Sequence, residues 1–108
     1  MKYIGIDIGG TNLKAGMVDE GGRLIAIKKM KIASISDAVS LTETLHVLVL
    51  ALCKETGTEE GELFSIGVGC PGTVEIRSGS IINTCNLPFR NVPLRRLYHQ
   101  MSKTPFNI

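Results

Sequence analysis

Residues 2–18 read K-Y-I-G-I-D-I-G-G-T-N-L-K-A-G-M-V, two apolar runs separated by a glycine pair. In the first run isoleucine alternates with small or polar residues, which is the pattern of a β-strand, and the glycine pair interrupts it. Residues 13–18 predict a second strand, and the turn signal D-E-G-G at residues 19–22 leads into a third apolar run at residues 23–32. Three strands joined by tight glycine turns predict an antiparallel meander.

The hydrophobic period changes after the third run, whose Lys28, Lys29 and Lys31 are typical of an edge strand. Apolar residues then recur at steps of three and four from residue 38 to residue 52. Ser36 or Asp37 would cap this helix and Gly57 would end it, after about five turns at 3.6 residues per turn. Further on, the sequence predicts a strand buried on both faces, a small hairpin, a second helix and the opening of another strand, at residues 63–69, 73–82, 92–102 and 105–108. This order predicts an α/β, ribonuclease-H-like (actin/hexokinase-type) lobe: a mixed sheet that contains the antiparallel three-strand meander, with flanking helices.

Size and composition are those of an ordinary globular domain. The 108 residues are 44% hydrophobic and 20% charged, and the net charge is only +2, with scattered basic residues. We therefore expect a single domain over residues 1–108 that binds neither nucleic acid nor a membrane. The cysteines lack C-x-x-C spacing, which indicates neither a disulfide framework nor a zinc site, and the N-terminus lacks a signal-peptide pattern. Reduced thiols then favour the cytoplasm.

The glycine pair between the first two strands has two interpretations. By itself, Gly9-Gly10 is usually only a hairpin turn. Here, however, the preceding strand brings Asp7 to its carboxyl end, the glycines leave backbone N–H groups free, and Thr11 adds a hydroxyl. Such a turn can cradle phosphate oxygens. Asp7 can hold a hydrated Mg²⁺, and Lys14 can supply a positive charge.

Two glycine spacings imitate other nucleotide sites and fail in context. The G-x-x-x-x-G spacing that ends at Gly10 is that of a Walker loop, but Thr11 stands where Lys is required, and a strand follows instead of a helix. Residues 67–72 fit the dinucleotide fingerprint G-x-G-x-x-G. That fingerprint must open a helix, whereas a proline and two β-branched residues surround its last glycine. We therefore reject both.

Four motifs in order resemble the ROK (repressor, open reading frame, kinase) family. They are D-I-G-G-T-N-L-K-A-G at residues 7–16 with Asp19 three residues on, G-V-G-C-P-G-T-V at 67–74, N-L-P-F at 86–89 and P-L at 93–94. The sugar kinases of this family transfer the ATP γ-phosphoryl group to a sugar hydroxyl. The resemblance implies the N-terminal lobe of an ATP-dependent hexose kinase that acts on a glucose-like sugar or an N-acetylhexosamine.

The resemblance also implies which residues bind each substrate. Those assigned to the ATP phosphates are Asp7, Gly9, Gly10, Thr11, Asn12 and Lys14, with Mg²⁺ held on Asp7 through water. Those assigned to the sugar are Gly72, Thr73 and Asn86. A strand terminator and an ordinary turn asparagine are the simpler interpretations of these last residues. The family's catalytic base is the Asp of an Asn-Asp pair after a strand resembling residues 105–108, so we expect it beyond Ile108, as we do the family's zinc motif and adenosine-binding lobe.

On this interpretation the chain is a truncated part of a kinase, inactive alone, whose parent binds a hexose, ATP and Mg²⁺ and forms a homo-oligomer. One alternative is a sugar-sensing ROK transcriptional regulator without kinase activity. Such regulators carry a helix-turn-helix ahead of the first motif, for which the position of Asp7 leaves no room. Another alternative is a naturally short sugar- or phosphate-binding module, against which the open-ended last strand argues.

Overall fold

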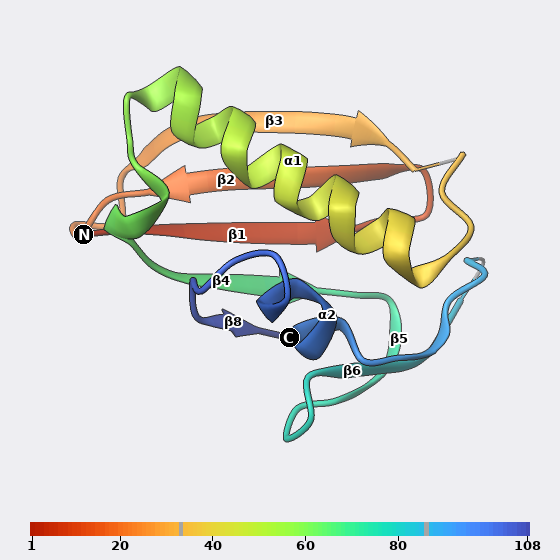
Figure 1. Cartoon of the computed structure of the whole chain (residues 1–108). Coiled ribbons are helices and arrows are strands. Elements are labelled where there is room, and N and C mark those ends of the chain that lie inside the picture. The colour runs from red at the N-terminus through yellow and green to blue at the C-terminus, as the bar shows by residue number, and fades with distance from the viewer. Residues whose placement is uncertain (33, 86) are drawn as a thin grey trace.

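Two β-sheets and two α-helices organise the chain (Figure 1). The structure, a computed structural model, describes residues 1–32, 34–85 and 87–108. The larger sheet has five strands in the order β3-β2-β1-β4-β8, and the smaller has three in the order β5-β6-β7. The bounds are β1 Lys2–Ile8, β2 Asn12–Val18, β3 Leu24–Lys31, α1 Ala38–Thr56, a short 3₁₀ helix Glu60–Glu62, β4 Leu63–Gly69, β5 Gly72–Glu75, β6 Ser80–Thr84, β7 Arg90–Val92, α2 Leu94–His99 and β8 Phe106–Asn107. This mixed sheet with its antiparallel meander and flanking helices confirms the predicted α/β fold class.

The meander forms where the alternating pattern predicts it. β1 pairs antiparallel with β2 and parallel with β4, so it lies inside the sheet. β3 is an edge strand, as its lysines predicted. In the turn between β2 and β3, the Asp19 carboxylate accepts hydrogen bonds from the backbone N–H groups of Arg23 and Gly21 at 3.0 and 2.9 Å. These bonds lower the pKa of Asp19 and fix the turn.

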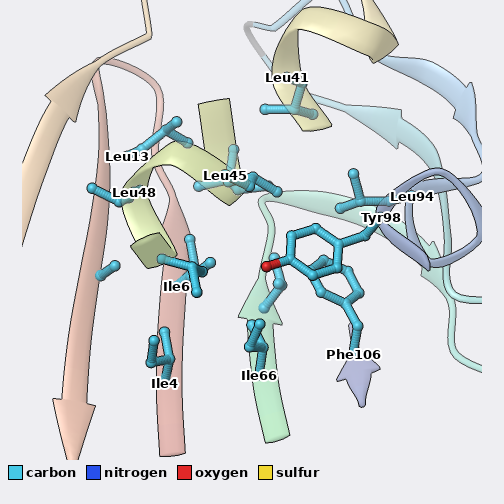
Figure 2. Packing of buried hydrophobic residues seen from close by; sticks show 14 of the residues in the cluster. Ile4, Ile6, Leu13, Leu41, Leu45, Leu48, Ile66, Leu94, Tyr98 and Phe106 are labelled. Atoms are coloured by element: carbon cyan, nitrogen blue, oxygen red, sulfur yellow. The ribbon is translucent and has the colours of Figure 1, made fainter. Parts of the chain in front are cut away.

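Helix α1 begins and ends at the predicted signals. The Asp37 side chain accepts a hydrogen bond from the backbone N–H of Ser40 at 2.8 Å, and Gly57 ends the helix in the left-handed conformation with φ 66°. Ser36, the other candidate cap, is not used. The buried side chains of α1, among them Leu41, Leu45 and Leu48, pack over the isoleucines of β1 (Figure 2). No helix in the described part of the chain has the length and hydrophobicity that crossing a membrane requires.

The second helix is shorter than predicted. The expected helix at residues 92–102 is instead α2, which covers only Leu94–His99, and Val92 belongs to β7. Asn91 has φ 51°, Val92 pairs with Ile81, and a residue that precedes a proline avoids the helical region, so the helix does not start at residue 92. At the other end the Ser102 hydroxyl donates to Glu60 Oε2 at 2.6 Å, which turns the chain away toward β8. Tyr98 stacks on Phe106 with ring centroids 4.4 Å apart, and this pair anchors α2 and β8 to the core (Figure 2).

Strand β4 is buried on one face only, which corrects the prediction of burial on both faces. Ile66 and Val68 lie in the core beneath α1 and α2, whereas Phe64 on the opposite face is 50% exposed. Both helices therefore cover the same face of the five-stranded sheet. The other face is open in this chain.

The small sheet contains one strand more than predicted. The hairpin expected at residues 73–82 is present as β5 and β6, and β7 adds to the far side of β6. Three residues of β7 show no alternation that a sequence pattern would reveal. The strand forms because Val92 pairs with Ile81 and is buried with it.

Candidate functional site

The predicted site segments emerge at one edge of the large sheet. β1, β4 and β8 run parallel, so their carboxyl ends lie at the same edge (Figure 1). The Gly9-Gly10 turn follows β1, and the Pro71-Gly72 turn follows β4. In open α/β sheets, ligands bind outside the carboxyl ends of the parallel strands. The fold thus brings the two predicted motifs to one place, although more than fifty residues separate them in sequence.

The turn after β1 presents free backbone donors. The N–H of Gly9 donates to Asn12 O at 2.9 Å and closes the loop. Thr11 O accepts from Ile32 N at 3.0 Å, which ties the loop to the end of β3. In the described chain the N–H groups of Gly10 and Thr11 have no partner, and both residues are exposed. Two free N–H groups in a turn can donate to an anion such as a phosphate oxygen.

Asp7 and Lys14 flank this turn on the open face of the sheet. They are directly opposed in the β1–β2 pairing, and both line a hollow of about 440 Å³ together with Gly69. Among the described residues neither side chain forms an ion pair or hydrogen bond. A free carboxylate beside free N–H donors fits a hydrated Mg²⁺ that bridges to phosphate, because Mg²⁺ keeps its waters and takes one or two carboxylates.

The turn after β4 requires glycine at residue 72. Gly72 has φ 122°, and a Cβ on it would lie 2.2 Å from Asn83 O. Its pairing with Thr84, and that of Thr73 with Asn83, starts the small sheet at once. Thr73 is exposed, so its hydroxyl is available to a ligand.

Thr84 is a structural residue of the site that the sequence prediction missed. Its hydroxyl donates to Leu87 O at 2.8 Å and lies 3.1 Å from Phe89 O, while Phe89 N donates back to it at 3.3 Å. Thr84 thereby holds Leu87 and Phe89 of the N-L-P-F motif in place. Asn86 itself lies outside the described residues, so its predicted sugar contact stays a prediction. The only signal for Thr84 in the sequence is that it occupies a position expected to be buried, just before that motif.

The pKa of Cys70 indicates that the turns after β1 and β4 lie close together. Burial, together with the negative charge of nearby Asp7, raises the pKa of the Cys70 thiol to about 11. Asp7 also pairs with Gly69, the residue before Cys70. The carboxylate of the first turn therefore acts electrostatically on the start of the second.

We expect Cys70 to resist alkylation at pH 8, although it is only partly buried. A thiol with a pKa of about 11 is about two orders of magnitude less ionised at that pH than an ordinary thiol of pKa about 8.5. Iodoacetamide labelling followed by peptide mass spectrometry should modify exposed Cys85 first, with Cys70 reacting only as the pH approaches 11. Asp7→Asn should speed Cys70 labelling at fixed pH. Equal labelling rates for Cys70 and Cys85 at pH 8 would contradict the assignment.

A second polar cluster lies at the opposite edge of the sheet. Glu60 accepts hydrogen bonds from Ser102 at 2.6 Å and from His46 Nε2 at 3.1 Å. It borders a hollow of about 570 Å³ at the amino ends of β4 and β8. None of the predicted site residues lies there. These bonds hold α1, the 3₁₀ helix and the segment before β8 together, which is a structural role.

The chain is similar to known proteins in sequence and in fold. A sequence model of the ROK family matches residues 3–108. A glucokinase from Pyrobaculum calidifontis is 29% identical over 93 residues, which are 86% of this chain and 27% of the relative. A xylose repressor from Caldicellulosiruptor bescii is 29% identical over 105 residues, 97% of this chain and 26% of the relative. In the solved structures, a glucokinase from Streptomyces griseus in complex with glucose and AMPPNP matches with a TM-score of 0.84 and 26% identity, over 100% of this chain and 32% of that chain. The chain thus spans about a quarter to a third of the length of these relatives.

Proposed function

Because the chain belongs to the ROK family, we propose that it is the N-terminal lobe of an ATP-dependent hexose kinase that phosphorylates a glucose-like sugar or an N-acetylhexosamine. The observation that carries this proposal is the edge where the free N–H groups of Gly10 and Thr11, the free carboxylate of Asp7 and the turn at Gly72 come together. A phosphate donor and a sugar acceptor must meet at one place for transfer. The similarity to the glucokinases supports the same conclusion.

In this proposal the chain supplies positioning and charge neutralisation. The N–H groups of Gly9-Gly10-Thr11, the Asn12 side chain and Lys14 bind the ATP phosphates, and Asp7 holds the waters of Mg²⁺. When bound, Mg²⁺ neutralises the charge that develops on the transferring phosphoryl group. The chain's own groups orient the phosphates toward the sugar, which Thr73, Gly72 and Asn86 hold by hydrogen bonds. The carboxylate that accepts the hydroxyl proton belongs to a residue after β8.

A sugar-sensing regulator is the second candidate, because the match to the xylose repressor covers 97% of this chain. Sugar binding alone does not separate the two functions, since both need the turn at Gly72. The turn at residues 9–11, with Asp7 before it, does separate the two functions. A regulator that only senses sugar has no use for the unpaired N–H groups of Gly10 and Thr11 beside the unpaired carboxylate of Asp7.

The deciding experiment uses the full-length protein that contains this chain. A coupled assay with ATP, Mg²⁺ and a panel of hexoses and N-acetylhexosamines should detect a sugar phosphate at a turnover of 1 s⁻¹ or more, the lower end of the typical range. A regulator would instead bind a sugar without consuming ATP and would release a DNA fragment when the sugar is added. Sugar binding with no phosphorylation of any panel member would overturn the kinase proposal.

Replacement of Asn86 tests the sugar pocket. Asn86→Ala in the full-length protein should raise the sugar KM and lower kcat/KM more than tenfold, because an amide that both donates and accepts to sugar hydroxyls is lost, at about 1.4 kcal/mol or more. The KM for ATP should stay within about twofold. The matched control is Gln100→Ala, which removes an exposed amide at the end of α2. Kinetics equal to those of the control for every sugar tested would remove Asn86 from the pocket.

A further inference from the structure

Arg95 connects three segments that are distant in sequence. Its Nη1 and Nη2 donate to Arg77 O and Ile76 O, both at 2.9 Å, in the turn between β5 and β6. Its Nε donates to Phe106 O in β8 at 3.0 Å. The backbone N–H of Arg95 adds a bond to Gly79 O at 3.0 Å. One residue of α2 thus fastens the tip of the hairpin to a strand of the other sheet.

The turn is shaped to receive this side chain. A Cβ on Gly79 would lie 2.5 Å from Arg95 Cβ and 2.8 Å from its Nε, so the arginine lies against the glycine with no room for a side chain. Gly79 also has φ 70°, which favours glycine. All acceptors are neutral carbonyls, and no described carboxylate pairs with Arg95. The planar guanidinium of Arg95 therefore holds three backbone carbonyls at fixed positions, which the single ammonium group of a lysine cannot do.

The two ends of the β5–β6 hairpin have different tasks. The near end begins at Gly72, at the same sheet edge as the Gly9-Gly10 turn, and the far end is the turn at residues 76–79 that Arg95 holds. The chain between them is four residues of β5, a length of about 13 Å at about 3.3 Å per residue. In the described chain the hairpin is also held by its pairing with β7, by buried Ile81 and by the backbone bond from Arg95 to Gly79. Loss of the Arg95 side chain therefore leaves the hairpin attached but releases the turn at residues 76–79 from β8. A shift of this turn is transmitted along β5 and β6 to Thr73 and Thr84, which lie at the other end of the hairpin.

We propose that Arg95 is a positioning residue for the sugar: it fixes the small sheet, with Thr73 and the segment 87–89, against β8, after which the proton-accepting residue follows. This inference rests on the proposed function. It assigns Arg95 no contact with sugar, ATP or metal. Its effect reaches the substrate only through the backbone it holds.

The test compares Arg95→Ala and Arg95→Lys with Arg96→Ala in the full-length protein. Arg96 is the adjacent, exposed arginine of the same helix and has no hydrogen bond among the described residues, so it controls for charge and helix propensity. Arg95→Ala should raise the sugar KM at least tenfold while the ATP KM stays within about twofold. Arg95→Lys should give a smaller rise in the same parameter. A purely structural role would instead lower kcat with the loss of folded enzyme and leave the sugar KM at the control value, which would overturn the proposal.

Gly79→Ala provides an independent variant in case Arg95→Ala fails to fold. It keeps the arginine and displaces it from the turn, so the sugar KM should rise at least fivefold, with the same insensitivity of the ATP KM. A folded Gly79→Ala variant with the sugar KM of Arg96→Ala would also overturn the proposal. If the wild-type protein binds a sugar in calorimetry without phosphorylating it, the kinase proposal fails but the role of Arg95 does not. The Arg95→Ala and Gly79→Ala variants should then raise the sugar Kd by the factors given for the sugar KM. Absence of binding to every sugar of the panel overturns both.

Discussion

Asp7→Asn in the full-length protein is expected to lower kcat for sugar phosphorylation about a hundredfold or more while the sugar Kd stays within about twofold. In the proposal this carboxylate holds Mg²⁺ through its waters, and a metal ion stabilises the transition state of phosphoryl transfer by several kcal/mol, at about 1.4 kcal/mol for each factor of ten. Asn has nearly the same shape, and the Asp7 side chain forms no hydrogen bond among the described residues. The turn after β1 should therefore keep its geometry.

The measurement is a titration of activity against Mg²⁺ at saturating sugar and ATP. Asp7→Asn should need a higher Mg²⁺ concentration for half-maximal activity, and its maximum should stay below that of the wild type. Glu43→Gln is the matched control, because it neutralises an exposed carboxylate on α1, the helix that covers the opposite face of the sheet from Asp7. Wild-type turnover by Asp7→Asn at limiting Mg²⁺ would show that the metal is held elsewhere.

The parts of the fold that local patterns determine could be predicted from the sequence. The alternation in β1, the turn at Asp19 and the leucine stripe of α1 each depend on residues within one or two turns of chain. The helix cap at Asp37 and the left-handed Gly57 follow from side-chain chemistry at single positions. The topology of the large sheet could be predicted as well, because a meander followed by a helix and a parallel strand can be arranged in only a few ways.

Elements that depend on distant partners could not be predicted in this way. β7 exists because of its pairing with β6, and the end of α2 is set by the bond between Ser102 and Glu60, 42 residues earlier in the chain. The apolar run of β4 suggested burial on both faces, yet its glycines and Phe64 face the open side. Composition alone does not tell which face a neighbouring segment covers.

The same division holds for the candidate site. The Gly9-Gly10 turn is a local motif, so Asp7 and the glycines after it could be proposed from the sequence, and the fold then brings them to the same sheet edge as Gly72. Arg95 could not be found, because its acceptors are backbone carbonyls 11 to 19 residues away. Such bonds carry no residue-type signal at the acceptor.

The 108-residue chain by itself is expected to show no detectable kinase activity. Under the proposed function the proton-accepting Asp follows β8, and loss of a general base typically costs about 10²- to 10⁴-fold in rate. Loss of the adenosine-binding lobe removes most of the positioning as well. Coupled assays with ATP, Mg²⁺ and the hexose panel decide this, with the full-length protein as the positive control. Sugar phosphate produced by the pure 108-residue chain would overturn the placement of the chemistry beyond Ile108.

The open face of the large sheet should also make this isolated chain self-associate. Gly16, Gly5 and Gly67 lie side by side across β2, β1 and β4, so the middle of the face has no side chains. Exposed apolar groups border it: Leu24 is 53% and Ile27 47% exposed, and Phe64 is 50% exposed. A glycine-lined face of this kind allows a second backbone or helix to approach closely, and the contact buries apolar area.

Light scattering at increasing protein concentration should therefore show dimers or larger species. Phe64→Lys, which places a charge on this face, should shift the chain toward the monomer by at least tenfold in dissociation constant. Val47→Lys is the matched control: it converts an equally exposed apolar residue, 54% exposed, on the far side of α1. An unchanged monomer at millimolar concentration would refute the association. Equal effects of the two lysine variants would mean that the chain associates through general hydrophobicity and that the glycine-lined face has no special part in it.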